Sequence, residues 1–186
     1  MKHVFKHADL VKVCLRQCQD SGKSAGRGQM YFTGDTIYSY GPHFPIAKIF
    51  RAPNGEEVIL FTTRTYSMTT TRHIAEVQRA VNHSHRKVVY CKFPDGFEHT
   101  RNLEHFKSEM EDAIAKHKKA RKPELYTGNI LYQATLARDY CEVMCLPVPT
   151  WAVMPDWSFV GIDKQFKGLP MKAWLTVQGG RETDLD

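Results

Sequence analysis

The chain of 186 residues lacks the sequence features of a membrane or secreted protein. It contains no apolar run close to the roughly 20 residues that a membrane-spanning helix requires. The first residues, MKHVFKHADLVKVC, are too polar for the apolar core of a secretory signal. Its five cysteines are an odd number and lie in apolar patterns, which favours reduced, mostly buried thiols over a disulfide framework. We therefore expect a cytoplasmic protein without a membrane partner.

Recognisable catalytic and cofactor motifs are missing as well. The sequence contains no G-x-S-x-G nucleophile elbow and no H-E-x-x-H zinc pattern. Segment 21–29 (SGKSAGRGQ) has glycine and lysine, but not in P-loop order, and indicates a mobile linker. Residues 26–83 contain only four acidic side chains, too few for a two-metal nuclease. We therefore predict no cofactor and favour a non-enzymatic function.

The spacing of the cysteines is compatible with one metal hypothesis. Cys14 and Cys18 lie four residues apart, and so do Cys141 and Cys145. On two helices each pair would share one face, so four thiolates could meet around a zinc ion. Structural zinc ligands more often lie in C-x2-C turns, and we therefore favour two helices that bury small apolar side chains.

Positive charge is concentrated in the first part of the chain. The formal net charge is +6, and residues 1–100 contain 14 Lys and Arg against 8 Asp and Glu. The two later parts, 101–145 and 146–186, are close to neutral. A basic surface attracts phosphate polymers or acidic proteins, so the charge predicts a nucleic-acid or protein partner without predicting a fold.

Hydrophobic periodicity predicts an α+β fold. An amphipathic helix is expected over 8–20, and a second helix, capped by Thr70, follows the strands. The strands should form a twisted antiparallel sheet, in which Pro53 and Gly55 make the turn of a hairpin. The predicted strands cover 30–33, 36–40, 44–51, 57–64 and 86–93.

The rest of the chain changes character twice. Apolar residues at helical spacing predict a helical hairpin, with one helix from Asn102 to Pro123 and another over 129–144. Residues 146–186 are rich in Trp and Pro and show no clean period, so we expect an irregular arm with a disordered end. We expect a basic domain (1–100), the hairpin (101–145) and the arm (146–186) to make one compact unit.

The tryptophans of the arm either pack on the domain, which we favour, or anchor a partner. They are Trp151, Trp157 and Trp174.

Two segments concentrate Tyr, Thr, Ser, His and Arg. They are GDTIYSYGPHFPIAKI (34–49) and VILFTTRTYSMTTTRHIAEVQRAVNH (58–83). Tyr38 and Tyr40 should share one face of a strand, with His43 at the bend that follows. The second segment runs from a strand into a helix, whose first turn carries hydroxyl groups.

We predict a site for an anion or a nucleic acid where these segments meet. Helix N-terminal amides, hydroxyls and arginines hold phosphate, and tyrosine rings stack on bases. The candidates are Tyr38, Tyr40, His43, Arg64, Thr70, Thr71, Arg72, His73 and Arg79. The alternative is that the hydroxyls cap the helix and the tyrosines pack against it, which needs no ligand.

A second candidate patch is the run KHKKARK (116–122). It carries five Lys and Arg at the predicted end of a helix, where positive charge complements the helix dipole. The same charges could contact phosphates, and the sequence does not decide between the two roles. The candidate residues here are Lys118, Lys119, Arg121 and Lys122.

The two segments resemble a small domain family carried by bacteriophages and related mobile elements. In that family a GDxIYSYGxHFPIA strand pair is followed by LFTTRxYSxTTxxH, which leads into a helix. The match covers about Gly34 to Ala80, roughly a quarter of the chain. The family has no assigned activity, so the resemblance implies an origin and no mechanism.

A phage origin implies two main classes of function. The first is a small accessory protein that binds nucleic acid through a basic face. The second is an inhibitor that docks on a host or defence complex, in the host cell cytoplasm. A hydrolase that uses His43 or His73 as a general base is the third hypothesis.

Overall fold

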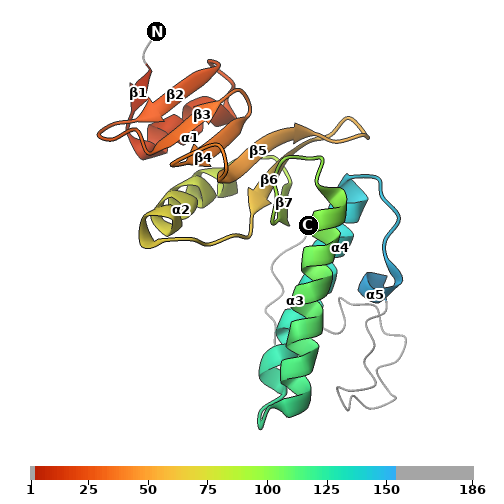
Figure 1. The fold of residues 1–186 in the computed structure, drawn as a ribbon. Helices are drawn as coiled ribbons and strands as arrows, with labels where there is room; N and C mark the ends of the chain where they lie inside the picture. Colours follow the sequence, from red (N-terminus) through yellow and green to blue (C-terminus); the bar gives the residue numbers. More distant parts are fainter. Residues whose placement is uncertain (1–2, 154–186) are drawn as a thin grey trace.

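The computed structural model describes residues 3–153, which form a seven-stranded sheet with helices on both faces (Figure 1). The predicted α+β class is confirmed, with a helix at the N-terminus and further helices after the sheet. The strands are β1 (Val4–Phe5), β2 (Ser21–Ser24), β3 (Met30–Thr33), β4 (Thr36–Ser39), β5 (Pro45–Arg51), β6 (Glu57–Thr62) and β7 (Val88–Cys91). The helices are α1 (His7–Leu15), α2 (Met68–Asn82), α3 (His99–Lys119), α4 (Glu124–Val143) and α5 (Thr150–Val153).

Neighbouring strands of the sheet follow one another in the sequence, from β1 to β7. Strands β2 to β6 pair antiparallel, as predicted, but β1 is parallel to β2 and β6 is parallel to β7. The prediction of a purely antiparallel sheet is therefore wrong for the strand pairs at both edges. The reason is that α1 and α2 each carry the chain back before the next strand begins, which makes the paired strands parallel.

The segment predicted as a mobile linker contains β2, so that prediction is wrong for residues 21–24. The strand alternates exposed and buried positions, but its buried residues are the small Gly22 and Ser24. A Cβ atom on Gly22 would lie 2.6 Å from Cε1 of Phe32, which packs over this position. The Ser24 hydroxyl accepts a hydrogen bond from the N–H of Met30 at 3.2 Å. Small residues thus hide the period-two pattern that normally identifies a strand.

Strand β6 is buried on both faces. Ile59 and Phe61 belong to the apolar core that contains α1 and α2. Val58 and Leu60 belong to a second core, formed with α3 and α4. Because successive side chains of a strand point to opposite faces, the two helical layers cover opposite sides of the sheet. The continuous apolar run VILF is what a strand covered on both sides requires.

Helices α3 and α4 form the predicted hairpin, which extends well beyond the sheet (Figure 1). Both helices begin earlier than predicted, at His99 and Glu124. Asp95 accepts hydrogen bonds from the N–H groups of Phe97 and Glu98, which shapes the turn before α3. The first helix ends at Lys119, with Ala120 already extended, so it stops before the predicted breaker Pro123. Pro123 instead precedes α4 as its N-cap, where its fixed φ, here −61°, suits the start of a helix.

Only one cysteine of each pair is buried: Cys14 and Cys141 are buried, whereas Cys18 and Cys145 are exposed and lie beyond the ends of their helices. Cys14 packs with α1 and α2, whereas Cys141 packs with the hairpin on the other face of the sheet. A zinc site that joins both pairs is therefore not formed. Burial raises the pKa of Cys14 to about 12, so its thiol stays neutral, as the favoured hypothesis of buried apolar residues requires.

The structure describes the start of the aromatic arm. Trp151, in the short helix α5, is half-buried and packs against the hairpin. For Trp151, the structure therefore agrees with the favoured prediction that the tryptophans of the arm pack on the domain. Trp157 and Trp174 lie outside the described residues. Within residues 3–153, none of the helices combines the length and the apolar character that a bilayer span needs.

Asn102 joins the segment after β7 to the helical hairpin. Its fully buried side chain accepts from the N–H of Phe93 at 2.9 Å and donates to the carbonyl of Phe93 at 3.0 Å. It also donates to the hydroxyl of Tyr140 at 3.1 Å, and this hydroxyl lies 2.9 Å from Nδ1 of His99. One amide side chain thus satisfies both backbone groups of Phe93.

Replacing Asn102 by Ala should lower the free energy of unfolding by about 1–3 kcal/mol, because the polar groups of Phe93 lose their partner. Urea unfolding measures the change. Ser108→Ala, on an exposed position of the same helix, should shift the value by less than about 0.5 kcal/mol. Equal values for the two variants would contradict the joining role of Asn102.

Candidate functional site

The candidate site lies at the carboxyl ends of the parallel strands β6 and β7. After β6 the chain enters α2 on one face of the sheet, and after β7 it enters α3 on the other face. In open α/β sheets, ligands bind outside the carboxyl ends of strands whose connections leave in opposite directions. Arg64 follows β6 by two residues, and Lys92 and Phe93 follow β7 directly.

Arg64 connects three parts of the chain that lie far apart in the sequence. Its Nη1 donates to the carbonyl of His43 at 3.3 Å, and its guanidinium lies 4.8 Å from the ring centroid of Phe44. The guanidinium also lies 6.0 Å from the ring of Phe93. The backbone N–H of Arg64 donates to the hydroxyl of Thr62 at 3.2 Å, which fixes the chain at the end of β6.

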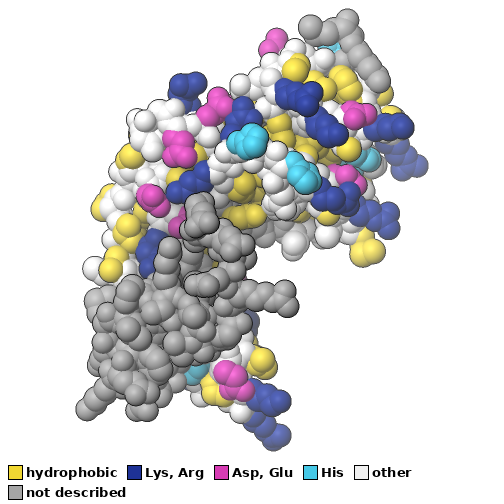
Figure 2. Space-filling view, turned by 180° about the vertical axis from the view of Figure 1, so that it is seen from behind, with side chains coloured by type: hydrophobic (Ala, Val, Ile, Leu, Met, Phe, Trp, Pro, Cys, Tyr) yellow, Lys and Arg dark blue, Asp and Glu magenta, His cyan; other side chains and the backbone are white. Residues whose placement is uncertain are grey.

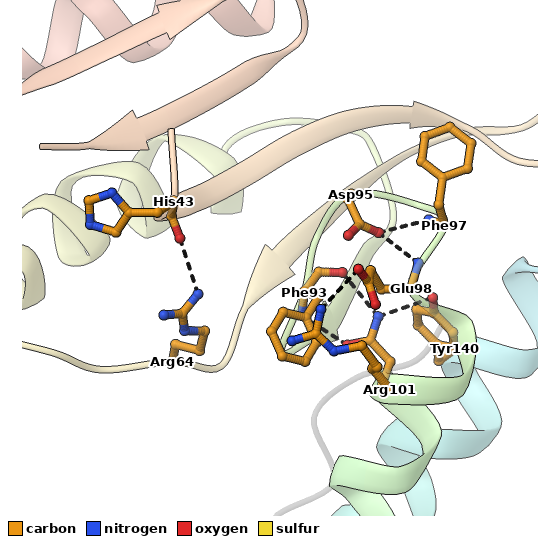
Figure 3. A network of polar contacts seen from close by, with 9 residues as sticks. His43, Arg64, Phe93, Asp95, Phe97, Glu98, Arg101 and Tyr140 are labelled. Atoms are coloured by element: carbon orange, nitrogen blue, oxygen red, sulfur yellow. Dashed lines mark hydrogen bonds and ion pairs between the residues drawn. The ribbon is translucent and has the colours of Figure 1, made fainter. Parts of the chain in front are cut away.

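Phe93 is surrounded by three cationic side chains. The guanidinium of Arg101 lies 4.0 Å from the ring centroid, and Nζ of Lys92 lies 5.8 Å from it, in addition to Arg64. Figure 3 shows Phe93 beside Arg101, with Arg64 on the neighbouring segment and pointing to His43. Arg101 also pairs with Glu98 at 2.9 Å, and both side chains are well exposed. We call Arg64, Lys92, Phe93 and Arg101 the Arg64 surface.

Lys92 of this surface lies beside His105 of helix α3 and, second to burial, lowers the pKa of its imidazole. Nζ of Lys92 lies 3.4 Å from Nδ1 of His105. Burial, and then the charge of Lys92, lower the pKa of His105, while Glu109 acts in the opposite direction.

The turn after β4 has an unusual backbone. Tyr40 has φ +65°, and the N–H of Gly41 donates to the carbonyl of Ser39 at 2.8 Å, so Tyr40 is the centre of a three-residue turn. This form is rare and strained for a residue with a side chain. A Cβ atom on Gly41 would lie 2.7 Å from Nδ1 of His43, so glycine leaves the space that the imidazole occupies.

Ser39 and His73 join the sheet to helix α2. The hydroxyl of Ser39 lies 2.8 Å from Nδ1 of His73, and both residues are buried. The rings of His7 and Tyr40 lie 5.2 and 5.9 Å from the ring of His73. Burial, and then His7, lower the pKa of His73, so the imidazole is neutral at pH 7. The pair therefore holds one hydroxyl in a fixed position at the end of β4.

Helix α2 begins one turn earlier than predicted. Ser67, not Thr70, is the N-cap: its hydroxyl accepts from the N–H of Thr70 at 3.2 Å. The hydroxyls of Ser67 and Thr70 lie 3.0 Å apart, and that of Thr71 donates to the carbonyl of Ser67 at 2.9 Å. The predicted capping role of the hydroxyls is therefore correct, although the predicted cap residue is wrong.

A pocket of about 160 Å³ opens between the strained turn and the start of α2. Its wall combines aromatic rings, an imidazole and hydroxyl groups, and it contains no carboxylate. The lining residues, which we call the Tyr40 pocket, are Ser39, Tyr40, His43, Phe44, Tyr66, Ser67 and Thr70. They come from both segments that carry the resemblance to the phage family. Since Arg64 contacts His43 and Phe44, the pocket adjoins the Arg64 surface.

Several predicted site residues lie elsewhere. The ring of Tyr38 stacks on Tyr31 across the sheet at 5.2 Å, whereas the ring of Tyr40 lies beside His73. The predicted common face is therefore wrong, because β4 ends at Ser39. Arg79 pairs with Glu76 at 3.0 Å. Exposed side chains outside the pocket include Arg72 and Thr71.

The basic run 116–122 lies at the tip of the helical hairpin, far from the sheet (Figure 1). On the face of the molecule that Figure 2 shows, basic side chains lie over the half that contains the sheet, and a separate group lies at the tip of the hairpin. The positions of Lys118, Lys119, Arg121 and Lys122 therefore do not extend the Arg64 surface. All four side chains are exposed.

Sequence reasoning missed part of this site. Lys92, Phe93 and Arg101 follow a strand whose parallel pairing with β6 is not visible in the sequence. A signal was nevertheless present, since Lys92-Phe93 directly follows the apolar run VVYC. Ser39 and Ser67 lie within the distinctive segments but were not selected as site residues.

The chemistry of the pocket favours binding over catalysis. Ser39 and His73 have the spacing of a nucleophile and its base. However, His73 is only 4% exposed and is packed against two other rings, and no carboxylate lines the pocket. The arrangement fits a hydroxyl held ready for a ligand. A hydrolase that uses His43 or His73 stays a prediction.

Protein-family models, curated proteins and solved structures were each compared with the chain, and none matched. The resemblance to a phage domain family therefore stays a prediction. The functional assignment rests on the geometry of residues 3–153.

Acidification should destabilise the protein through His73. Because its pKa is lowered in the folded state, the unfolded chain binds more protons below about pH 6.5, and the free energy of unfolding should fall from pH 7 to pH 5. His73→Gln should flatten this dependence, leaving the part due to His105. The control His83→Gln, at an exposed position, should leave the pH dependence of the free energy of unfolding as it is in the wild type. Parallel pH profiles for wild type and His73→Gln would contradict the assignment.

Gly41→Ala should displace the imidazole of His43, because the added methyl group meets its ring. The expected result is a changed NMR signal of His43 together with a loss of about 1–3 kcal/mol in stability. Gly128→Ala is the matched control, since no atom lies within 4 Å of its added Cβ. That helical position should instead gain about 0.5–1 kcal/mol. An unperturbed His43 signal in Gly41→Ala would show that the turn does not hold the ring.

Proposed function

We propose that the protein binds nucleic acid through the Arg64 surface. The observation that carries the proposal is the convergence of three cations from separate segments around one aromatic ring, that of Phe93. Like charges repel, so the folded chain spends free energy to gather them, and a polyanion would relieve this repulsion.

The chemistry of the surface supports a nucleic-acid ligand. Positive side chains that follow the phosphate backbone, combined with exposed aromatic rings, are the usual means of binding single strands without sequence preference. The Arg64 surface supplies the charges, and Tyr66 beside it is 82% exposed. Arg101 is paired with Glu98, but this ion pair is exposed and contributes little by itself.

The proposed interface differs in part from the one predicted from the sequence. Arg64 stays at its centre, and Tyr40 and His43 stay beside it. Arg79 does not line the Tyr40 pocket, and the hairpin tip is distant. Lys92, Phe93 and Arg101 replace them as contacts. A docking function on a host complex would use the same charges on an acidic protein, and the test below separates the two.

The test compares the salt dependence of binding. The double variant Arg64→Gln/Arg101→Gln removes two proposed phosphate contacts. The slope of log affinity against log salt concentration should then fall by about 1.4 to 1.8 for single-stranded or duplex DNA. Fluorescence anisotropy with labelled DNA and RNA oligonucleotides measures the slope.

The matched control is Arg51→Gln/Lys107→Gln, which removes the same charge from exposed, ion-paired positions outside the surface. Its slope should equal that of the wild type. Equal slopes for both double variants would refute the Arg64 surface as the interface. Absence of binding to any nucleic acid at low salt would refute the function and favour the docking hypothesis.

A further inference from the structure

We infer that the Tyr40 pocket receives one unpaired nucleobase, so that the ligand is a single strand. This inference rests on the proposed function and names the ligand class of the adjoining site. In a duplex the bases are stacked and paired, and a base reaches such a pocket only when it is unpaired or turned out of the helix.

The aromatic wall of the pocket fits a flat ring. Tyr40 and Tyr66 are 49% and 82% exposed, whereas Phe44, which also lines the pocket, is buried. The rings of Phe44 and Tyr66 are tilted by 52° with their centroids 6.4 Å apart. Exposed aromatic side chains cost solubility, and stacking with a base would cover them.

The polar wall fits the edge of a base. A hydroxyl both donates and accepts hydrogen bonds, so Ser39, Ser67 and Thr70 can serve any base edge. Ser39 is held by His73, and Ser67 and Thr70 are held by each other. These hydroxyls are therefore preorganised, which lowers the entropic cost of binding.

Arg64 connects the pocket to the phosphate contacts. Its guanidinium touches the turn that carries His43 and also faces Phe93. A strand whose phosphates follow Arg101 and Arg64 therefore passes the mouth of the pocket. Because the pocket has no carboxylate, nothing in its wall repels the phosphate next to the inserted base.

The strained turn gives independent support. A positive φ at a tyrosine is costly and persists only when the surroundings impose it, a condition common at ligand sites. Here the hydrogen bond from Gly41 to Ser39 and the packing of His43 over Gly41 impose it. The strain turns the ring of Tyr40 from the sheet toward His73 and the pocket.

The experiment pairs protein variants with strands that carry or lack a base. Oligonucleotides of about 12 nucleotides suit the size of such sites. One is an ordinary single strand, one is abasic at all central positions, and one is a duplex of equal length. The variant Tyr40→Ala/Tyr66→Ala removes the rings, and Tyr40→Phe/Tyr66→Phe retains them.

The alanine variant should bind the ordinary strand roughly 5- to 150-fold more weakly, the effect expected for a lost stacking contact. Its affinity for the abasic strand should equal that of the wild type, and its salt slope should be unchanged because no charge is lost. The phenylalanine variant should bind both strands like the wild type. Wild type should prefer the single strand to the duplex.

Two results would overturn the inference while the proposed function stands. The first is an equal loss for ordinary and abasic strands, which would place the tyrosines outside base contact. The second is that the alanine variant binds the ordinary strand as tightly as the wild type does, while Arg64→Gln/Arg101→Gln still lowers the salt slope as proposed. Absence of any nucleic-acid binding would overturn the proposed function and this inference together.

Discussion

Strand β6 faces an apolar core on each side, and this constraint fixes the arrangement of the other elements. One core needs α1 and α2, and the other needs α3 and α4, so the chain must leave the sheet toward opposite faces after β6 and after β7. The residues that follow these strands are then left at one edge, between the two helical layers. Arg64 and Phe93 occupy this edge, where they reach solvent and each other. Packing of the core thus creates the place where charge and aromatic rings gather.

Much of the fold was predictable because hydrophobic period and turn chemistry are local signals. The hairpin closed by Pro53 and Gly55, the apolar run of β6 and the helical hairpin were all visible in the sequence. The parallel edges were not, because pairing between strands separated by a helix leaves no local pattern. Strand β2 was missed because its buried residues are the small Gly22 and Ser24, which contact Phe32 and Met30 of the next strand.

The candidate site was half predictable for the same reason. Tyr40, His43 and Arg64 lie in segments with an unusual composition, and the structure brings them together. Tyr38 shares that composition but stacks on Tyr31, which only the register of β3 and β4 determines. Lys92, Phe93 and Arg101 join the site through the parallel pairing of β6 and β7 and the contacts around Phe93. The run 116–122 has a high local charge, yet it lies at the tip of the hairpin and away from the proposed interface.

Mapping amide chemical shifts by NMR, with a single-stranded oligonucleotide added stepwise to the whole protein, tests the central claim most directly. Binding at the edge between the layers predicts the largest shifts in residues 39–44, 64–70 and 92–101, with little change at 116–124. The largest shifts at the hairpin tip, with the three other segments unchanged, would contradict the account.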